Sequence, residues 1–273
     1  MSAFRAACVQ LRSSDDVAGN IKTASALIRE ARAMGADFIA TPENTTLMAP
    51  DGGAKLERSF AEDTDPALPA FQALAEETGA WLLIGSLAIK TSPTKTANRS
   101  FLIDPKGRIA ARYDKIHLFD TDPGAGESYR ESNTVAGGAR AVLADLPWGR
   151  LGMTICYDLR FAKLYRTLAQ RGAFMLSVPS AFTETTGKAH WHVLLRARAI
   201  ENFCYVIAPA QGGVHANGRA TYGHSLIVAP WGEVLAEAGT EPGIILAEID
   251  PAAVLAARSR VPSLSHDRDF EAP

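Results

Sequence analysis

The chain is poor in cysteine, and this shortage excludes two classes of protein. Its 273 residues include three cysteines, Cys8, Cys156 and Cys204, and no C-x-x-C pair. Three thiols that lie far apart and are odd in number exclude a disulfide framework, and they offer no paired ligands for zinc or redox chemistry. We therefore expect a reducing compartment, the cytoplasm.

The chain also lacks a charge bias and a long apolar run. Its 28 basic and 30 acidic residues leave a formal charge of −2, which gives no basic surface for nucleic acid and no acidic tail. No apolar run approaches the length that a membrane span needs. The first residues, MSAFRAACVQLRSSDD, show no basic leader followed by an apolar stretch. We expect no nucleic-acid partner, no membrane and no secretory signal.

The composition that remains is that of an ordinary globular protein. Hydrophobic residues make up 47% and charged residues 21% of a chain long enough to bury a large core. No linker rich in Ser, Gly or Pro divides the sequence. We therefore predict a single domain over residues 1–273.

Strand-like and helix-like patterns alternate along the chain. FRAACVQL is typical of a buried strand, and helical spacing of apolar residues follows from Asp15 to a stop at Gly35. The strand ADFIATPE, the helix PALPAFQALAEETG and the strand AWLLIGSLAI come next. After Cys156 the pattern predicts the helix RFAKLYRTLAQRG and the strand AFMLSVP. This alternation favours an α/β fold in which helices pack on sheets.

Three segments share a turn of the form Pro-x-Gly between two strand-like runs. They are SFLIDPKGRIAARY, AVLADLPWGRLGMTIC and SLIVAPWGEVLAEA. Each predicts a β-hairpin.

The segment KAHWHVLLRARAIENF is a predicted helix with apolar residues on more than one side. Trp191 and Leu195 lie on one side, and Val193 and Ile200 lie on another. A helix of this kind usually packs against other elements on two sides. We expect it to pack both on a sheet and against a second subunit.

Lys115 is predicted to point inward. In GRIAARYDKIHLFD, strand alternation places Lys115 on the same face as Ile109, Ala111 and Tyr113. A strand-end lysine often extends to water, and a buried ammonium is costly unless carboxylates lie beside it. Lys115 therefore needs acidic partners.

Three glutamates are candidate partners. Glu43 follows an apolar strand, at the end where open α/β sheets place their ligand sites, although it could also be an ordinary acid in a turn. Glu131 and Glu127 share a glycine-rich loop downstream of Lys115, and either could be a solvated loop acid. The local sequence does not choose between them.

Cys156 is either a buried thiol that closes a strand or a nucleophile. Strand alternation places it on the side of Gly152 and Thr154, whose small side chains leave room beside the sulfur. A helix start follows, which would stabilise a thiolate. A strand end with room around a thiol suits a nucleophile, but buried and inert cysteines are common.

Taken together, these motifs resemble the nitrilase superfamily of carbon–nitrogen hydrolases. TPENT is similar to the family's glutamate motif, YDKIHLFD to its lysine motif and GMTICYDLRF to its cysteine motif, and RESNT, LLRARAIEN, YGHSLIV and PWGEV also match. The likeness runs nearly end to end. It is strongest to the amidase branch that includes deaminated glutathione amidase and omega-amidase.

The resemblance implies a fold and a set of catalytic roles. The family fold is a four-layer α-β-β-α sandwich, its members form homodimers or larger homo-oligomers, and they need no cofactor or metal. By the same resemblance Glu43 is the general base, Lys115 the catalytic lysine, Cys156 the nucleophile and Glu131 a second glutamate beside them. The expected reaction converts a small carboxylate-bearing amide to an acid and ammonia through a thioester, and N-carbamoyl amides are an alternative substrate class.

Four further residues are predicted to contact the substrate. The backbone N–H of Tyr157 is expected to help Lys115 bind the oxyanion. Phe182 and Thr183 are expected to border the pocket, by resemblance alone. Arg160, just past the nucleophile, is a candidate to bind a substrate carboxylate, but it could equally pair with Asp158 or another acid.

One position departs from the family pattern. Most members have His-Trp-Glu where this chain has HWH, so His192 replaces an acid. The shape of the neighbouring pocket could therefore differ.

Three other functions remain open from the sequence. A Cys-His hydrolase could use one of six histidines, although no signature of such an enzyme is present. A metal enzyme is disfavoured, because the two histidines of HWH stand at i and i+2 of a helix and do not face each other. The third alternative is an assembly or scaffold protein with vestigial activity.

Overall fold

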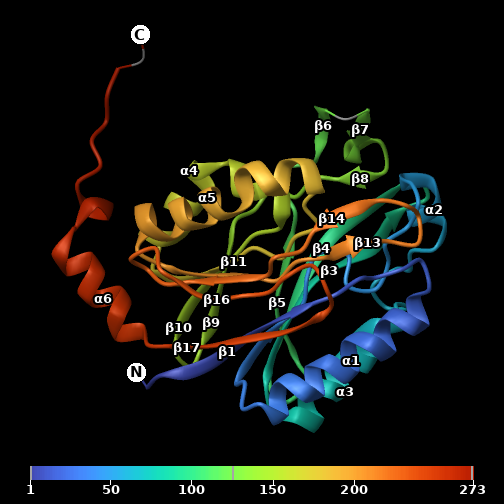
Figure 1. Cartoon of the computed structure of the whole chain (residues 1–273), viewed down its shortest axis with the longest axis horizontal. Coiled ribbons are helices and arrows are strands. Elements are labelled where there is room, and N and C mark those ends of the chain that lie inside the picture. Colours follow the sequence, from blue (N-terminus) through green and yellow to red (C-terminus); the bar gives the residue numbers. More distant parts are fainter. Residues whose placement is uncertain (1, 125, 272) are drawn as a thin grey trace.

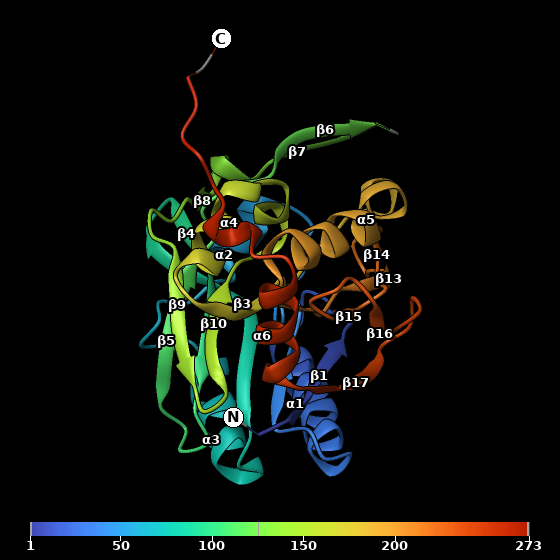
Figure 2. The ribbon, with the colours of Figure 1, turned by 90° about the vertical axis from the view of Figure 1, so that its left-hand side faces the viewer.

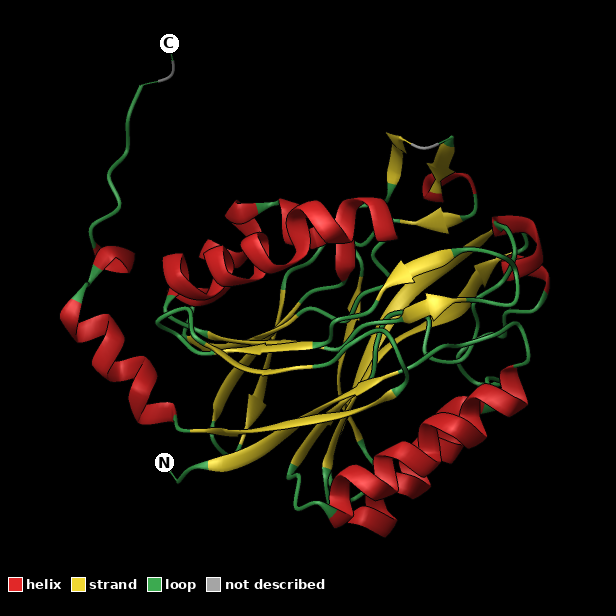
Figure 3. Cartoon of the chain, viewed as in Figure 1, coloured by secondary structure: helices red, strands yellow, loops and turns green. Residues whose placement is uncertain are grey.

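The computed structural model describes residues 2–124, 126–271 and 273, and it arranges the secondary structure in four layers (Figures 1 and 2). Helices α1 and α3 cover the outer side of one sheet, and α4 and α5 cover the outer side of a second sheet that faces the first (Figure 3). The predicted α-β-β-α sandwich is confirmed. The helices are α1 (Val17–Ala33), α2 (Gly52–Glu57), α3 (Ala67–Thr78), α4 (Ala162–Gln170), α5 (Glu184–Asn202) and α6 (Pro251–Arg260), with 3₁₀ turns η1 (Glu131–Asn133), η2 (Cys156–Arg160) and η3 (Ser263–Ser265).

The first sheet has the strand order β17-β1-β2-β3-β4-β5, with β8 paired to β4. Its strands are β1 (Phe4–Gln10), β2 (Phe38–Ala40), β3 (Trp81–Ser92), β4 (Lys95–Ile103), β5 (Ile109–Asp114), β8 (Val135–Ala136) and β17 (Gly243–Ile249). The core pairs β1–β2 and β2–β3 are parallel, as the strand–helix–strand pattern predicts.

The second sheet has the order β16-β15-β12-β11-β10-β9. Its strands are β9 (Val142–Leu146), β10 (Gly149–Met153), β11 (Ala173–Ser177), β12 (Tyr205–Ala208), β15 (Leu226–Val228) and β16 (Val234–Glu237). Two small ribbons pair β6 (Asp120–Gly124) with β7 (Glu127–Arg130) and β13 (Gly212–Val214) with β14 (Ala220–Tyr222). All three predicted hairpins form, as β4–β5, β9–β10 and β15–β16.

Strand β1 shows why the sheets are covered on both faces. Ala6 and Cys8 belong to the core cluster that includes side chains of both sheets, whereas Ala7 and Val9 belong to the cluster formed with α1 and α3. The alternation of a strand sends neighbouring side chains to opposite faces, so an apolar run of this kind is buried on both.

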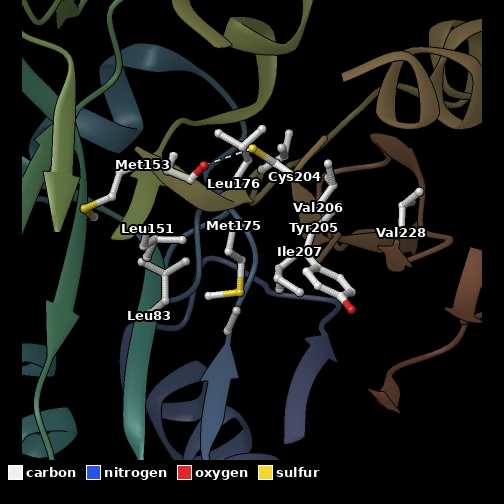
Figure 4. Packing of buried hydrophobic residues seen from close by; sticks show 14 of the residues in the cluster. Leu83, Leu151, Met153, Met175, Leu176, Cys204, Tyr205, Val206, Ile207 and Val228 are labelled. Carbon is white, nitrogen blue, oxygen red and sulfur yellow. Dashed lines mark hydrogen bonds between the residues drawn. The ribbon is translucent and has the colours of Figure 1, made fainter. Parts of the chain in front are cut away.

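The space between the sheets is filled by large apolar side chains. Leu83 of β3 lies in one cluster with Leu151 and Met175 of the second sheet (Figure 4). Burying such a side chain fully contributes roughly 1.5–3 kcal/mol. Close packing here fixes the distance between the strand ends of the two sheets.

Local signals set the helix ends. The side chain of Asp16 accepts a hydrogen bond from the backbone N–H of Gly19 and caps α1. Helix α3 ends at Gly79, whose φ of 63° is left-handed. Within the described part of the chain, no helix combines the length and the apolar character that crossing a bilayer requires.

The predicted chemistry-bearing residues follow strand ends. Glu43 comes three residues after β2, and Lys115 directly follows β5. Strand β10 ends at Met153, so the predicted alternation does not extend to Cys156, which instead begins the turn η2. The backbone of Ile155 is still extended, and the chain turns sharply at Cys156, whose φ is 49°.

Candidate active site

A cavity of about 300 Å³ opens where these strand ends meet. Side chains from the segments that follow the strands line it, among them Glu43, Lys115, Glu131 and Cys156. The aromatic side chains of Phe119, Tyr129, Tyr157 and Phe182 form part of its wall. The cavity has the size of a site for a small molecule.

Lys115 is buried between two carboxylates. Its side chain is 2% exposed, and its Nζ lies 2.9 Å from Oε1 of Glu43 and 2.8 Å from Oε2 of Glu131. The inward orientation predicted from strand alternation is thus present. Two acidic partners offset the cost of burying the ammonium, and they hold its pKa well above the ordinary value despite burial.

Asn98, on strand β4, holds the two carboxylates in place. Its Nδ2 donates to Oε1 of Glu43 at 2.9 Å and to Oε1 of Glu131 at 3.1 Å. The other oxygen of Glu43 accepts a hydrogen bond from the backbone N–H of Ala181 at 3.0 Å. Asn98 does not stand out in the sequence, because nothing in its neighbourhood along the chain distinguishes it from an ordinary strand residue.

The structure distinguishes Glu131 from its rival Glu127. Oε2 of Glu131 also accepts a 2.7 Å hydrogen bond from the backbone N–H of Phe119, so it is fixed beside Lys115. Glu127 instead accepts hydrogen bonds from the hydroxyls of Tyr129 and Thr185. Among the two glutamates of this loop, Glu131 is the one that contacts Lys115.

Cys156 sits in a strained turn beside Glu43. Its left-handed backbone is rare for a residue with a side chain and costs of order 1–3 kcal/mol. Its backbone N–H donates to the carbonyl of Pro179 at 3.0 Å, which holds the turn against the end of β11. Cys156 is 7% exposed and lines the cavity together with Glu43.

The electrostatics of the site keep the thiol protonated. Burial and the negative charge of Glu43 raise the pKa of Cys156, and the positive charge of Lys115 only partly opposes them. The expected lowering by a helix start is therefore outweighed. The pKa of Glu43 is lowered to about 2, because the charge of Lys115 and hydrogen bonds outweigh the effect of burial. The resting state is a neutral thiol next to a carboxylate.

Asp158 stabilises the turn of Cys156 through hydrogen bonds. Its buried carboxylate accepts hydrogen bonds from the Tyr113 hydroxyl at 2.7 Å and from the backbone N–H of Ile155 at 2.9 Å. It also accepts a hydrogen bond from the backbone N–H of His117 at 3.1 Å. Asp158 therefore ties the segment around Lys115 to the turn of Cys156. In the sequence it stood out only as a possible partner of Arg160.

Three of the four predicted substrate contacts line the cavity, and one does not. Tyr157, Phe182 and Thr183 are part of the wall. The Thr183 hydroxyl is engaged in capping α5, where it accepts from the N–H of Thr186 at 3.2 Å.

Arg160 lies outside the cavity lining. Its guanidinium packs over the rings of Tyr157 and Phe182 and contacts Nδ1 of His190 at 3.3 Å. This position does not favour the predicted contact with a substrate carboxylate. The suggested pairing with Asp158 is also absent from the ion pairs of the described residues, since the Asp158 oxygens bond to other groups.

Besides Lys115 and Arg130, which pairs with Asp122, two further cations line the cavity. Lys55 donates to Oδ1 of Asn44 at 2.7 Å, and burial lowers its pKa. The Arg219 guanidinium packs over the ring of Tyr129, and one of its amino groups donates to the carbonyl of Ala181 at 2.8 Å. Its buried Nε has no hydrogen-bond partner within the described part of the chain. Neither cation stands in a motif that the sequence analysis singled out.

No histidine is among the described residues that line the cavity. The two histidines of HWH have different partners, since His190 contacts Arg160 and His192 contacts Glu237. Away from the cavity, the side chains of His192, His224 and Glu237 form one group whose potential ligand atoms lie within 4.8 Å of one another.

Known proteins share this fold and much of this sequence. Residues 5–259 match the family described as Carbon-nitrogen hydrolase. A deaminated glutathione amidase from Synechocystis is 43% identical over 271 residues, which cover 97% of this chain and 98% of that protein. The human protein of that name is 40% identical over 267 residues, with 96% of this chain and 81% of that protein covered.

A solved structure agrees with the sequence comparison. The C. elegans NitFhit protein superposes with a TM-score of 0.91 at 36% identity, over 98% of this chain and 66% of that one. The present chain thus spans about two thirds of the length of NitFhit.

Proposed function

Because the chain belongs to the carbon–nitrogen hydrolase family, we propose that it hydrolyses a small carboxylate-bearing amide of the deaminated glutathione type, through a thioester on Cys156. One observation carries the proposal. Glu43, Lys115 and Cys156, which are far apart in the sequence, meet at a single cavity, with Glu131 as the second acid on the lysine.

In the first half of the reaction, Glu43 removes the proton of the Cys156 thiol as the sulfur attacks the amide carbon. The developing oxyanion is stabilised by Lys115 and by the backbone N–H of Tyr157, and one such donor is typically worth about 10²–10³ in rate. Glu43 then passes its proton to the leaving nitrogen, and the C–N bond breaks. The enzyme is left as a thioester, and the carboxylate is ionised again.

In the second half, Glu43 takes a proton from water as the water oxygen attacks the thioester carbon. The carbon–sulfur bond breaks, the acid leaves, and the thiol regains its proton from Glu43. A positioned acid or base of this kind contributes roughly 10²–10⁴. The protonated thiol and ionised carboxylate of the resting site are the states that this cycle begins with.

Lys55 and Arg219 are the proposed binding partners of substrate carboxylates. Both are cationic and both line the cavity, and the buried Nε–H of Arg219 finds no hydrogen-bond partner among the residues that the structure describes. A charge-assisted hydrogen bond to a carboxylate would satisfy that donor. Arg160, the candidate that the sequence suggested for this contact, lies outside the cavity lining.

The leaving group distinguishes the candidate substrates. In deaminated glutathione the scissile nitrogen belongs to a cysteinylglycine dipeptide, so hydrolysis releases that dipeptide and not the ammonia expected from the sequence. Omega-amides of keto acids, in contrast, release ammonia. Purified enzyme should be assayed against both classes, with the dipeptide and ammonia measured separately. Faster turnover of the keto-acid amide would replace the proposed substrate with the alternative.

The intermediate is tested by mass spectrometry. Acid quenching during turnover should give an adduct of the acyl group on the peptide that contains Cys156, and Cys156→Ala should give neither adduct nor product while keeping its fold. Turnover by Cys156→Ala would exclude the mechanism. A wild-type chain with no adduct and no activity on any amide would instead support the scaffold alternative.

We further propose that residues 1–273 act as one cytoplasmic domain and that the chain forms a homodimer or larger homo-oligomer. Helix α5 supports the assembly, because it exposes Val193 at 68% and Ile200 at 43%. In light scattering, the Val193→Asp variant should form particles of smaller mass than the wild type. Lys188→Asp, on a charged part of the same helix, should have the particle mass of the wild type.

A further inference from the structure

Two histidines and a glutamate converge where helix α5 meets the second sheet. Nε2 of His192 and Nδ1 of His224 each lie 2.9 Å from Oε1 of Glu237. His192 belongs to α5, His224 to the loop between β14 and β15, and Glu237 ends β16. The three come from separate elements, so only the folded chain brings them together.

The rings are held in place by their surroundings. The ring of Tyr222 stacks on His224 with centroids 4.3 Å apart and meets His192 edge to face at 5.9 Å. The indole N–H of Trp191 donates to the carbonyl of His224 at 2.7 Å. Helix α5 approaches β14 so closely that a Cβ on Gly187 would lie 2.3 Å from Tyr222. Packing against these neighbours therefore fixes the orientation of the two imidazole rings.

We propose that His192, His224 and Glu237 form a binding site for a divalent metal ion of the zinc class. Imidazole nitrogen and carboxylate oxygen are ordinary zinc ligands, with bonds of about 2.0–2.2 Å. Tetrahedral ligands at such bond lengths lie about 3.3 Å apart. The present 2.9 Å contacts need to open only slightly to admit the ion, while the imidazole protons that now point at Glu237 are released or shift to the other ring nitrogens.

The site is placed to stabilise rather than to catalyse. None of its three residues is among the described residues that line the cavity of Cys156. The side chains are 32%, 26% and 38% exposed, which leaves room for water in a fourth position. An ion here would join α5 to the edge of the second sheet. His192 supplies the second imidazole of the group.

Cobalt(II) provides a direct readout, because its visible bands report coordination geometry. Wild-type protein stripped with a chelator should bind one equivalent of Co²⁺ with the strong absorption of a tetrahedral site, and Zn²⁺ should abolish that absorption. Cys156→Ala should give the same spectrum. A thiolate-to-cobalt charge-transfer band that disappears in Cys156→Ala would place the metal at the catalytic thiol and overturn the proposal.

Conservative variants test the ligands. His192→Gln keeps a hydrogen-bond donor toward Glu237. His224 has a left-handed φ of 54°, which Asn tolerates, so His224→Asn keeps the backbone. Each of these and Glu237→Gln should weaken Co²⁺ binding at least tenfold, whereas His190→Gln on the same helix should bind as wild type does. Zn²⁺ should raise the melting temperature of the wild type and not that of Glu237→Gln. Absence of binding, or equal binding by all four variants, would refute the site.

Discussion

The hydroxyl of Tyr113 donates a 2.7 Å hydrogen bond to the carboxylate of Asp158, and this contact joins the two halves of the catalytic apparatus. Tyr113 lies two residues before Lys115, on the first sheet. Asp158 lies two residues after Cys156, in the turn that follows the second sheet. The distance between the Lys115 amine and the Cys156 sulfur therefore depends on the hydrogen bond between Tyr113 and Asp158.

Tyr113→Phe should reduce kcat by about tenfold to a hundredfold, because small displacements of reacting groups are costly. Losing a hydrogen bond to a buried charge should also lower the free energy of unfolding by about 1.5–3 kcal/mol. Tyr165→Phe is the matched control, since its hydroxyl bonds to Thr154 at 2.7 Å within the second half. Urea unfolding and steady-state kinetics measure the two effects. Equal losses of kcat in both variants would show that Asp158 has no special positioning role.

Glu43→Gln should lower the rate of turnover and at the same time lower the pKa of the Cys156 thiol. Turnover should fall by about 10²–10⁴, because the proton acceptor is lost. The pKa of the Cys156 thiol should fall, because the negative charge of Glu43 is removed while Lys115 remains. Alkylation by iodoacetamide, followed by mass spectrometry across a pH series, reads that pKa. A thiol pKa that rises in this variant would contradict the assigned charge states.

Glu131→Gln should remove most turnover, because Lys115 would lose one of its two charged partners. The loop offers a matched control in Glu127→Gln, whose partners are two hydroxyl groups rather than the lysine. We expect a kcat loss of at least tenfold in the first variant and a change of less than threefold in the second. If the two variants behave alike, Glu131 is an ordinary loop acid.

The pH profile of kcat/KM should show a broad plateau. The folded-state pKa of Glu43 is about 2, below its ordinary 4.5, so the carboxylate is ionised across the neutral range. The stability that its ion pair adds is complete above pH 4.5 and is lost as the pH falls toward 2. Lys115 stays charged well into the alkaline range. An acid limb near pH 6.5 would instead indicate the Cys-His alternative.

Arg219→Gln should raise KM for substrates that carry a carboxylate, because a buried cation beside the cavity is lost. Removal of one partner of such a charge-assisted contact costs about 1.5–3 kcal/mol, or roughly 10- to 150-fold. Arg160→Gln serves as the comparison, since that guanidinium packs outside the cavity lining. The uncharged amide acetamide should show little difference between the variants. A larger effect of Arg160→Gln would restore the interpretation made from sequence.

Much of the fold could be predicted because its signals are local. The buried alternation of β1, the spacing of α1 and the turn residues of three hairpins each lie within about twenty residues. The identity of Lys115 as an inward lysine also follows from alternation within one strand. Asn98, Asp158 and Arg219 could not be found this way, because their roles arise from contacts between residues that are distant in sequence. The position of Arg160 could not be predicted for the same reason, since only packing against Tyr157 and Phe182 shows where its side chain goes.

The left-handed backbone of Cys156 has a consequence for how the protein matures. The left-handed turn is held by Pro179 and Asp158, and Asp158 in turn bonds to Tyr113 of the first sheet. We therefore expect the sulfur to reach its final position only after both sheets have docked. Catalysis should then be the last property to return during refolding, later than circular dichroism or tryptophan fluorescence. The rate at which product formation returns in a stopped-flow refolding experiment would thus report the final step of folding.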